Sequence, residues 1–112
     1  MDRHALFFLL VCCALTLVAA SVQAQRPVVI KGRVTDTSGR PVAAALIGVA
    51  AFNASTTSDT HGTYRLVIGS RVRAGQHAVL TASREGFDYA RRAVILAPGA
   101  ELTESFRLRP LE

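Results

Sequence analysis

The chain has few of the side chains that cross-link small exported domains or carry out chemistry. It contains no tryptophan, one methionine, three histidines and two cysteines in 112 residues. The cysteines, Cys12 and Cys13, are neighbours inside an apolar N-terminal run, so the rest of the sequence has neither a disulfide nor a thiolate metal site. A domain of this composition must be stabilised by burial of its aliphatic side chains.

The N-terminus has the three parts of a secretory signal peptide. Arg3 lies in a short polar start, residues 5–20 are almost entirely apolar, and residues 22–24 supply a small-residue cleavage site. The apolar run is shorter than the ~20 residues that a membrane-spanning helix needs, and no comparable run follows. We therefore expect residues 1–24 to form a cleaved signal-peptide helix and residues 25–112 to form one exported domain, periplasmic or secreted, without a membrane span.

Positive charge outweighs negative charge. Thirteen lysines and arginines face eight acidic residues, a formal net charge of +5 at pH 7, and Lys31 is the single lysine. A basic surface attracts phosphate-bearing and other anionic partners, but it also keeps an exposed sheet soluble. Nucleic acid is a poor partner for an exported chain, and the sequence lacks the aromatic residues that would interleave with the cations to stack on bases.

Beyond the N-terminal run, apolar and polar residues alternate in short segments separated by Gly, Pro and Asp, a pattern typical of β-strands. The predicted strands are residues 28–34, 42–52, 55–58, 64–68, 77–83, 90–96 and 102–108. Seven short strands with frequent turns predict an all-β fold, an antiparallel β-sandwich whose two inner faces supply the core.

Two of the turns share one pattern, in which Asp lies three residues before Gly. The first runs from Asp36 to Gly39 and the second from Asp59 to Gly62. An Asp side chain can accept hydrogen bonds from backbone N–H groups ahead of it, and Gly tolerates a positive φ. We interpret both aspartates as turn residues rather than as metal ligands or reactive carboxylates.

The sequence offers little for catalysis or metal binding. His61 lies in a predicted turn and His77 begins a predicted strand, and the histidines lack the short spacing of a metal site even with Asp59 and Asp88 nearby. No serine has a recognisable nucleophile elbow. We expect no enzyme activity, no metal and no cofactor.

Several segments, taken in order, resemble the carboxypeptidase regulatory-like domain, a transthyretin-like (prealbumin-like) β-sandwich. The matching segments are Gly32–Asp36, Gly39–Val42, Ala45–Ile47, Thr57–Tyr64 and Gly86–Phe87. They cover nearly all of the chain after the predicted signal peptide. At the position of Ala44 the family commonly has Gly.

The resemblance implies a non-catalytic binding or interaction module of the cell envelope, whose partner is a protein or a glycan. A second hypothesis is a truncated or vestigial N-terminal domain of a TonB-dependent outer-membrane receptor, because the ending Phe106–Leu111 is similar to the exit from such a module toward a receptor plug. Hydroxyisourate hydrolases have a related fold, but their C-terminal Tyr-Arg-Gly-Ser tail has no counterpart in this sequence.

The family fold also implies that residues 28–34, 64–68 and 102–108 are neighbours in one sheet. Their outward side chains then form a candidate surface for phosphate, an acidic glycan or an acidic protein. The alternative is that these cations keep an exposed sheet face and its edges soluble and unpaired. The residues of this surface are Lys31, Arg33, Arg65, Arg107 and Arg109. The sequence leaves the oligomeric state open.

Overall fold

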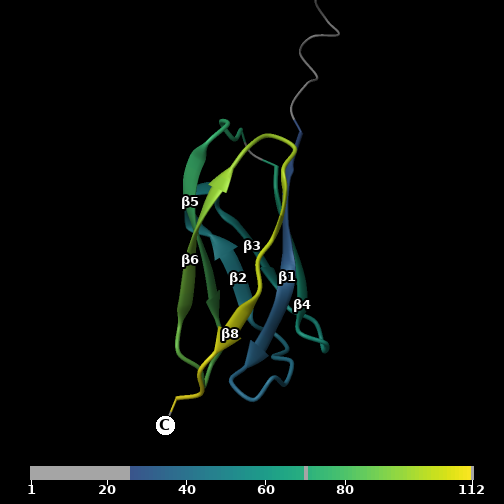
Figure 1. The fold of residues 1–112 in the computed structure, drawn as a ribbon, viewed down its shortest axis with the longest axis vertical. Coiled ribbons are helices and arrows are strands. Elements are labelled where there is room, and N and C mark those ends of the chain that lie inside the picture. Colours follow the sequence, from purple (N-terminus) through teal and green to yellow (C-terminus); the bar gives the residue numbers. More distant parts are fainter. Residues whose placement is uncertain (1–25, 70, 112) are drawn as a thin grey trace, which may run out of the picture.

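The computed structural model describes residues 26–69 and 71–111. Over these residues two sheets pack face to face, and the C-terminus lies at the end of the sandwich opposite the start of β1 (Figure 1). The predicted signal peptide, residues 1–24, lies outside the described residues. The elements are β1 (Val28–Asp36), β2 (Leu46–Val49), the 3-10 turn η2 (Ala50–Phe52), β3 (Ala54–Thr57), β4 (Thr63–Ile68), β5 (Gln76–Ser83), β6 (Ala90–Leu96), β7 (Glu101–Thr103) and β8 (Phe106–Leu108).

The first sheet is built around β1. On one side β1 pairs antiparallel with β4, and on the other it pairs first with β7 and then, farther along, with β8. Both of these latter pairings are parallel, so the predicted antiparallel arrangement does not extend to this edge. Alternation of apolar and polar residues indicates which face each side chain takes, but it carries no information about strand direction.

The second sheet has the order β3-β2-β5-β6, and all of its pairings are antiparallel. Burial alternates strictly along β4 and nearly so along β5, which leaves one face of each sheet for the core. Burying one large aliphatic side chain contributes about 1.5–3 kcal/mol, so many contacts share the stabilisation. The all-β sandwich predicted from the sequence is therefore confirmed. The largest fully buried side chains are Ile30, Ile47, Leu66, Ile68, Leu80, Leu96, Leu108, Val28, Val34 and Val49.

The predicted strand at residues 42–52 is shorter in the structure. Only Leu46–Val49 is extended, because Ala44 takes a positive φ of 58° before it and Ala50–Phe52 forms a 3-10 turn after it. The alternation of small and apolar residues does not reveal these two bends, since alanine is compatible with strand, turn and helix alike.

Ser58 holds the first of these bends. Its hydroxyl donates to the Val42 carbonyl at 2.7 Å and accepts from the Ala45 N–H at 2.9 Å. Its backbone carbonyl accepts from the Ala44 N–H, also at 2.9 Å. Ser58 is the one buried polar or charged side chain in the described part of the chain, and these bonds satisfy it where no water reaches.

The predicted last strand is divided into β7 and β8, which raises the strand count of the described residues from seven to eight. Between them the Glu104 carbonyl turns toward β1 and accepts a hydrogen bond from the Tyr64 hydroxyl. A Cβ at Gly32 would overlap this carbonyl, so only glycine fits there. Burial, followed by the Glu104 charge, raises the pKa of Tyr64 to about 12.

Candidate binding surface

The turn after β1 is closed by the carboxylate of Asp36. One oxygen, Oδ1, accepts from the Ser38 N–H at 2.8 Å, from the Ser38 hydroxyl at 2.6 Å and from the Arg40 N–H at 3.0 Å. The Ser38 hydroxyl bond is the main reason that the pKa of Asp36 lies below its ordinary value. Gly39 completes the turn with a φ of 87°. All of the acceptor capacity of Oδ1 is thus used inside the turn.

The turn before β4 repeats this chemistry. Oδ1 of Asp59 accepts from the His61 and Thr63 N–H groups, each at 2.9 Å, and Gly62 has a φ of 78°. The interpretation of both aspartates as turn residues is confirmed by these bonds. Both carboxylates thus bond the backbone of their own turns, which positions the neighbouring strands.

The structure does not bring the histidines together. His61 lies in the turn between β3 and β4, whereas His77 lies on the exposed face of β5 in the other sheet, and Asp88 is in the loop between β5 and β6. Among residues 26–69 and 71–111, no group of three or more His, Cys, Asp or Glu side chains is placed to hold a metal ion.

The predicted cations gather on the outer face of the first sheet. Lys31 lies directly opposite Arg65 in the β1–β4 pairing, and Arg107 of β8 lies opposite Thr35 of β1. Partners in register share a face, and Arg33 follows Lys31 by two residues, so these four cations all point away from the core. Each is exposed.

Arg109, the fifth predicted residue, lies one position past the end of β8. It is exposed, and its carbonyl accepts from the Asp88 N–H at 2.8 Å, which joins the chain end to the loop between β5 and β6. It follows Leu108, which is buried, so the alternation of β8 directs its side chain toward the face that carries Arg107.

Two of these arginines are anchored by the neighbouring turns. Nε of Arg33 donates to the His61 carbonyl at 3.2 Å, and Nη2 of Arg107 donates to the Thr37 carbonyl at 2.5 Å. A guanidinium has five N–H donors, so each keeps several for a ligand while its orientation is restricted. The structure therefore holds part of this charge in place before any partner arrives.

None of the five cations is neutralised by a carboxylate of the described chain. The one salt bridge among residues 26–69 and 71–111 joins Arg92 of β6 to Glu104 at 2.9 Å, and it closes the edge between the two sheets. Glu101 is on the basic face but lies opposite Val29, one row away from Lys31. The five cations therefore form no salt bridge within the described residues, and Glu101 is the nearest acidic residue of the strands on their face.

Four hydroxyl side chains lie among the cations, and no local pattern in the sequence points to them. Thr63 is opposite Arg33, Thr103 is opposite Lys31, and Thr35 is opposite Arg107. Ser105 accepts from the Arg33 N–H through its hydroxyl at 3.3 Å. The positions of these hydroxyls relative to the cations depend on strand register, and register is set by pairing between segments that are distant in the sequence.

The opposite outer face, on the second sheet, has a different character. The exposed fractions of Leu46, Val79 and Ile95, which lie there, are 51%, 49% and 60%. Arg91 of β6 is the one charged side chain at the outward positions of the strands of this sheet. The sandwich therefore has one basic face and one nearly uncharged face.

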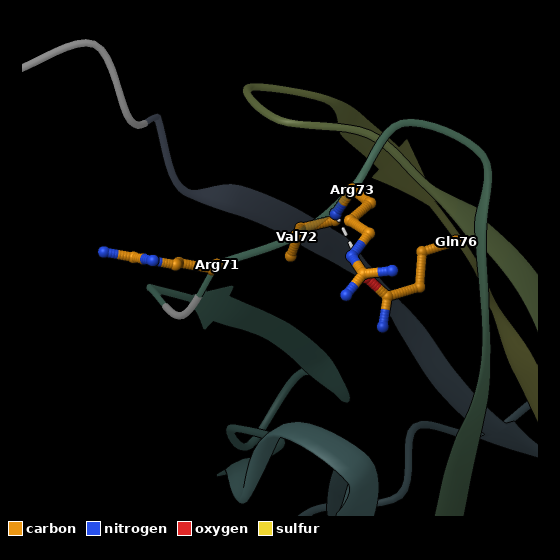
Figure 2. A pocket seen from close by; sticks show the side chains of 4 residues that line it. All are labelled: Arg71, Val72, Arg73 and Gln76. Carbon is orange, nitrogen blue, oxygen red and sulfur yellow. Dashed lines mark hydrogen bonds between the residues drawn. The ribbon is translucent and has the colours of Figure 1, made fainter.

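A hollow of about 690 Å³ lies in the loop between β4 and β5. Arg71, Val72, Arg73 and Gln76 line it, and the Arg73 N–H donates to Oε1 of Gln76 at 3.0 Å (Figure 2). The Arg71 side chain extends away from that of Arg73. The lining has no carboxylate, histidine or nucleophile, so it offers no means of acid–base or covalent catalysis.

Comparison with a family model identifies the family of the chain. The model of the carboxypeptidase regulatory-like domain matches residues 29–109, so the chain belongs to this family of non-catalytic domains. The search of curated proteins gave no match.

In the described residues no helix has both the length and the apolar character needed to cross a bilayer.

Solved structures show the same fold at low sequence identity. They include 3-chlorocatechol 1,2-dioxygenase from Rhodococcus opacus 1CP, with a TM-score of 0.57, 14% identity, and coverage of 79% of this chain and 62% of that chain. A chain of a type II cohesin–X-dockerin complex from Acetivibrio cellulolyticus gives 0.56, 12%, 72% and 56%. Catechol 1,2-dioxygenase from Acinetobacter sp. ADP1 gives 0.57, 12%, 80% and 54%. The chain spans less than two thirds of each, and these identities show the fold alone.

Proposed function

We propose that this protein is a non-catalytic interaction module, exported to the cell envelope, that binds an anionic protein or glycan through the outer face of its first sheet. The observation that carries the proposal is the set of exposed cations on that face that form no salt bridge within the described residues, two of them anchored by turns. A rigid sheet that presents fixed charge lowers the conformational cost of binding.

The comparisons support an interaction module in a general way. The chain belongs to a family of non-catalytic domains, and one solved neighbour comes from a cohesin–X-dockerin complex, an assembly of proteins. The proposal includes the absence of enzyme activity and of a cofactor. Incubation of the purified protein with hydroxyisourate tests this point, and hydrolysis above the uncatalysed rate would contradict it.

Export is part of the proposal and has its own test. Cleavage at the small-residue site leaves Gln25 as the first residue of the mature protein. We expect N-terminal sequencing of the protein recovered from a periplasmic or secreted fraction to begin there. Recovery of the intact N-terminus from the cytoplasm alone would overturn the envelope location.

The alternative is a truncated or vestigial N-terminal domain of a TonB-dependent outer-membrane receptor. It is supported by the family membership and by the exposed segment after β8, from which a chain could continue. The neighbouring downstream reading frame distinguishes the two hypotheses. A plug and barrel encoded there would favour the receptor.

The binding proposal is tested by retention on native envelope material. We expect the double variant Lys31→Gln/Arg65→Gln to be retained less than wild type, because it removes two cations that make no side-chain hydrogen bond within the described residues. The control is Arg73→Gln/Arg91→Gln, which removes the same charge elsewhere on the surface. Equal retention of wild type and both variants would overturn the role of this face.

A further inference from the structure

The cations of the basic face follow a diagonal line across three strands. Arg65 on β4 lies opposite Lys31 on β1, and Arg33 comes two residues after Lys31 on β1. Arg107 on β8 lies opposite Thr35, which comes two residues after Arg33. We call these four residues the basic track, and Arg109 lies just beyond its end. Cross-strand neighbours are ~5 Å apart and residues i and i+2 of a strand ~7 Å apart, so the track is on the order of 20 Å long.

The track carries an electrostatic cost that no salt bridge of the described residues offsets. Lys31 and Arg65 are a like-charge pair directly opposite each other, an arrangement that destabilises an antiparallel ladder. The described chain places no carboxylate in a salt bridge with either. If the cations served only solubility, they would not need to be adjacent. An anion bound across the pair would relieve the repulsion.

The hydroxyl groups beside the track indicate the chemistry of the ligand. Thr63, Thr103, Thr35 and Ser105 give each cation a neighbouring hydroxyl donor and acceptor. From the linear charge and these hydroxyls we propose that the basic track binds an extended acidic polysaccharide, which lies diagonally over β4, β1 and β8. This inference rests on the proposed function and specifies its partner.

Other anionic partners fit the surface less well. A single phosphate would use one or two cations and leave the rest unpaired. An extended acidic peptide binds sheets best along an edge strand, where backbone groups are free. The track instead crosses the strands diagonally, and two of its four cations lie on β1, whose backbone is paired on both sides. A bilayer surface would favour cations surrounded by several exposed apolar side chains. Among the large exposed apolar residues of the strands, the basic face carries Val67, whereas Leu46, Val79 and Ile95 lie on the opposite face.

The direct test measures binding of the purified protein to polygalacturonate, a linear polymer with a carboxylate on each sugar. The comparison probes are galacturonate monomer, neutral dextran, polyglutamate, inorganic phosphate and vesicles of anionic phospholipid. We expect affinity to rise with the length of galacturonate oligomers until they span the track and then to level off. Binding should weaken as salt concentration rises, because the contacts are ionic.

The most informative variant is Lys31→Glu. It converts the repulsive cross-strand pair with Arg65 into an attractive one, so we expect the denaturant midpoint of the free protein to rise while affinity for polygalacturonate falls by roughly tenfold or more. The control Arg91→Glu makes the same charge change on the other face and should leave polymer affinity within about twofold. A gain in stability together with a loss of binding is not expected of a damaged fold.

The outcomes separate this inference from the proposed function. Equal binding of polyglutamate and polygalacturonate, both lost in Lys31→Glu, would overturn the polysaccharide assignment and leave an anion-binding module. Phosphate or vesicles that bind as tightly as the polymer would overturn the linear arrangement. Failure of wild type to bind any anionic probe or envelope material would overturn both.

Discussion

Ala44 is held in a backbone conformation that suits glycine better than alanine. Its φ of 58° lies in the left-handed region, where a Cβ costs about 1–2 kcal/mol. The three hydrogen bonds of Ser58 to Val42, Ala44 and Ala45 compensate for this strain. The departure from the family's usual glycine, visible in the sequence, therefore has a physical cost in the structure.

We expect Ala44→Gly to raise the free energy of unfolding by roughly 0.5–1 kcal/mol, since relief of strain outweighs the added freedom of the unfolded chain. Ala43→Gly is the matched control: Ala43 is exposed and lacks a positive φ, so the same change should lower stability. Urea denaturation measures both. Equal effects of the two variants would contradict the strain argument.

Gly32 is required for a different reason, the close approach of another segment. We expect Gly32→Ala to lower the free energy of unfolding by about 1–3 kcal/mol, because the new methyl group displaces the Glu104 carbonyl and its bond to Tyr64. Gly69→Ala, with open space around the added Cβ, is the control and should have a small effect. Denaturant unfolding of the two variants distinguishes crowding from the general effect of replacing glycine.

At the scale of the elements, the two Asp-to-Gly turns fix the ends of β1 and the start of β4. In both turns one carboxylate oxygen accepts from two backbone N–H groups that lie two residues apart, so each strand meets its turn in a defined direction. This places Arg107 and Arg33 beside the turn carbonyls of Thr37 and His61. The turns therefore contribute indirectly to the candidate binding surface.

The lowered pKa of Asp36 predicts a pH dependence of stability. A carboxyl group whose pKa is lower in the folded state stabilises the fold above its unfolded pKa, and this contribution is lost as the pH falls through the folded value. We expect the wild-type denaturant midpoint to fall in acid below the ordinary Asp pKa of 3.8. Asp36→Asn keeps an acceptor oxygen without a titrating carboxyl, so its midpoint should fall less over the same range. Parallel curves for the two proteins would contradict this assignment.

At the scale of the whole molecule, the two sheets are joined at one edge by Arg92. Its Nη1 donates to Oε2 of Glu104 at 2.9 Å and to the Ser105 carbonyl at 2.6 Å, and its guanidinium lies 4.9 Å from the centre of the Phe106 ring. The side chain belongs to β6 of the second sheet, whereas its three partners lie on or beside β8 of the first.

We expect Arg92→Ala to lower the free energy of unfolding by about 1–2 kcal/mol, chiefly through the lost contacts with Ser105 and Phe106. The ion pair itself is partly exposed, at 44% and 25%, so a double-mutant cycle with Glu104→Ala should give a coupling of only ~0.2–1 kcal/mol. A coupling as large as the whole loss in Arg92→Ala would show that the ion pair dominates.

The sequence by itself determined the local features of this protein. Alternation predicted which residues face the core, Asp-Gly spacing predicted both turns, and the ordered segments identified the family. These features depend on residues a few positions apart, where side-chain periodicity and turn chemistry operate. The same local signals predicted one continuous strand at residues 42–52 and another at residues 102–108. Ser58 bonds the bend in the first segment and Tyr64 bonds the break in the second, and both residues come from other parts of the chain.

Only the tertiary structure decided how the segments face one another. The parallel pairing of β7 and β8 with β1, the like-charge pair of Lys31 and Arg65, and the diagonal order of the basic track depend on register between strands tens of residues apart. Register is set by how the two sheets bury their apolar faces together, which no local pattern specifies. The sequence thus named the cations, and the packing of the sandwich arranged them into a line.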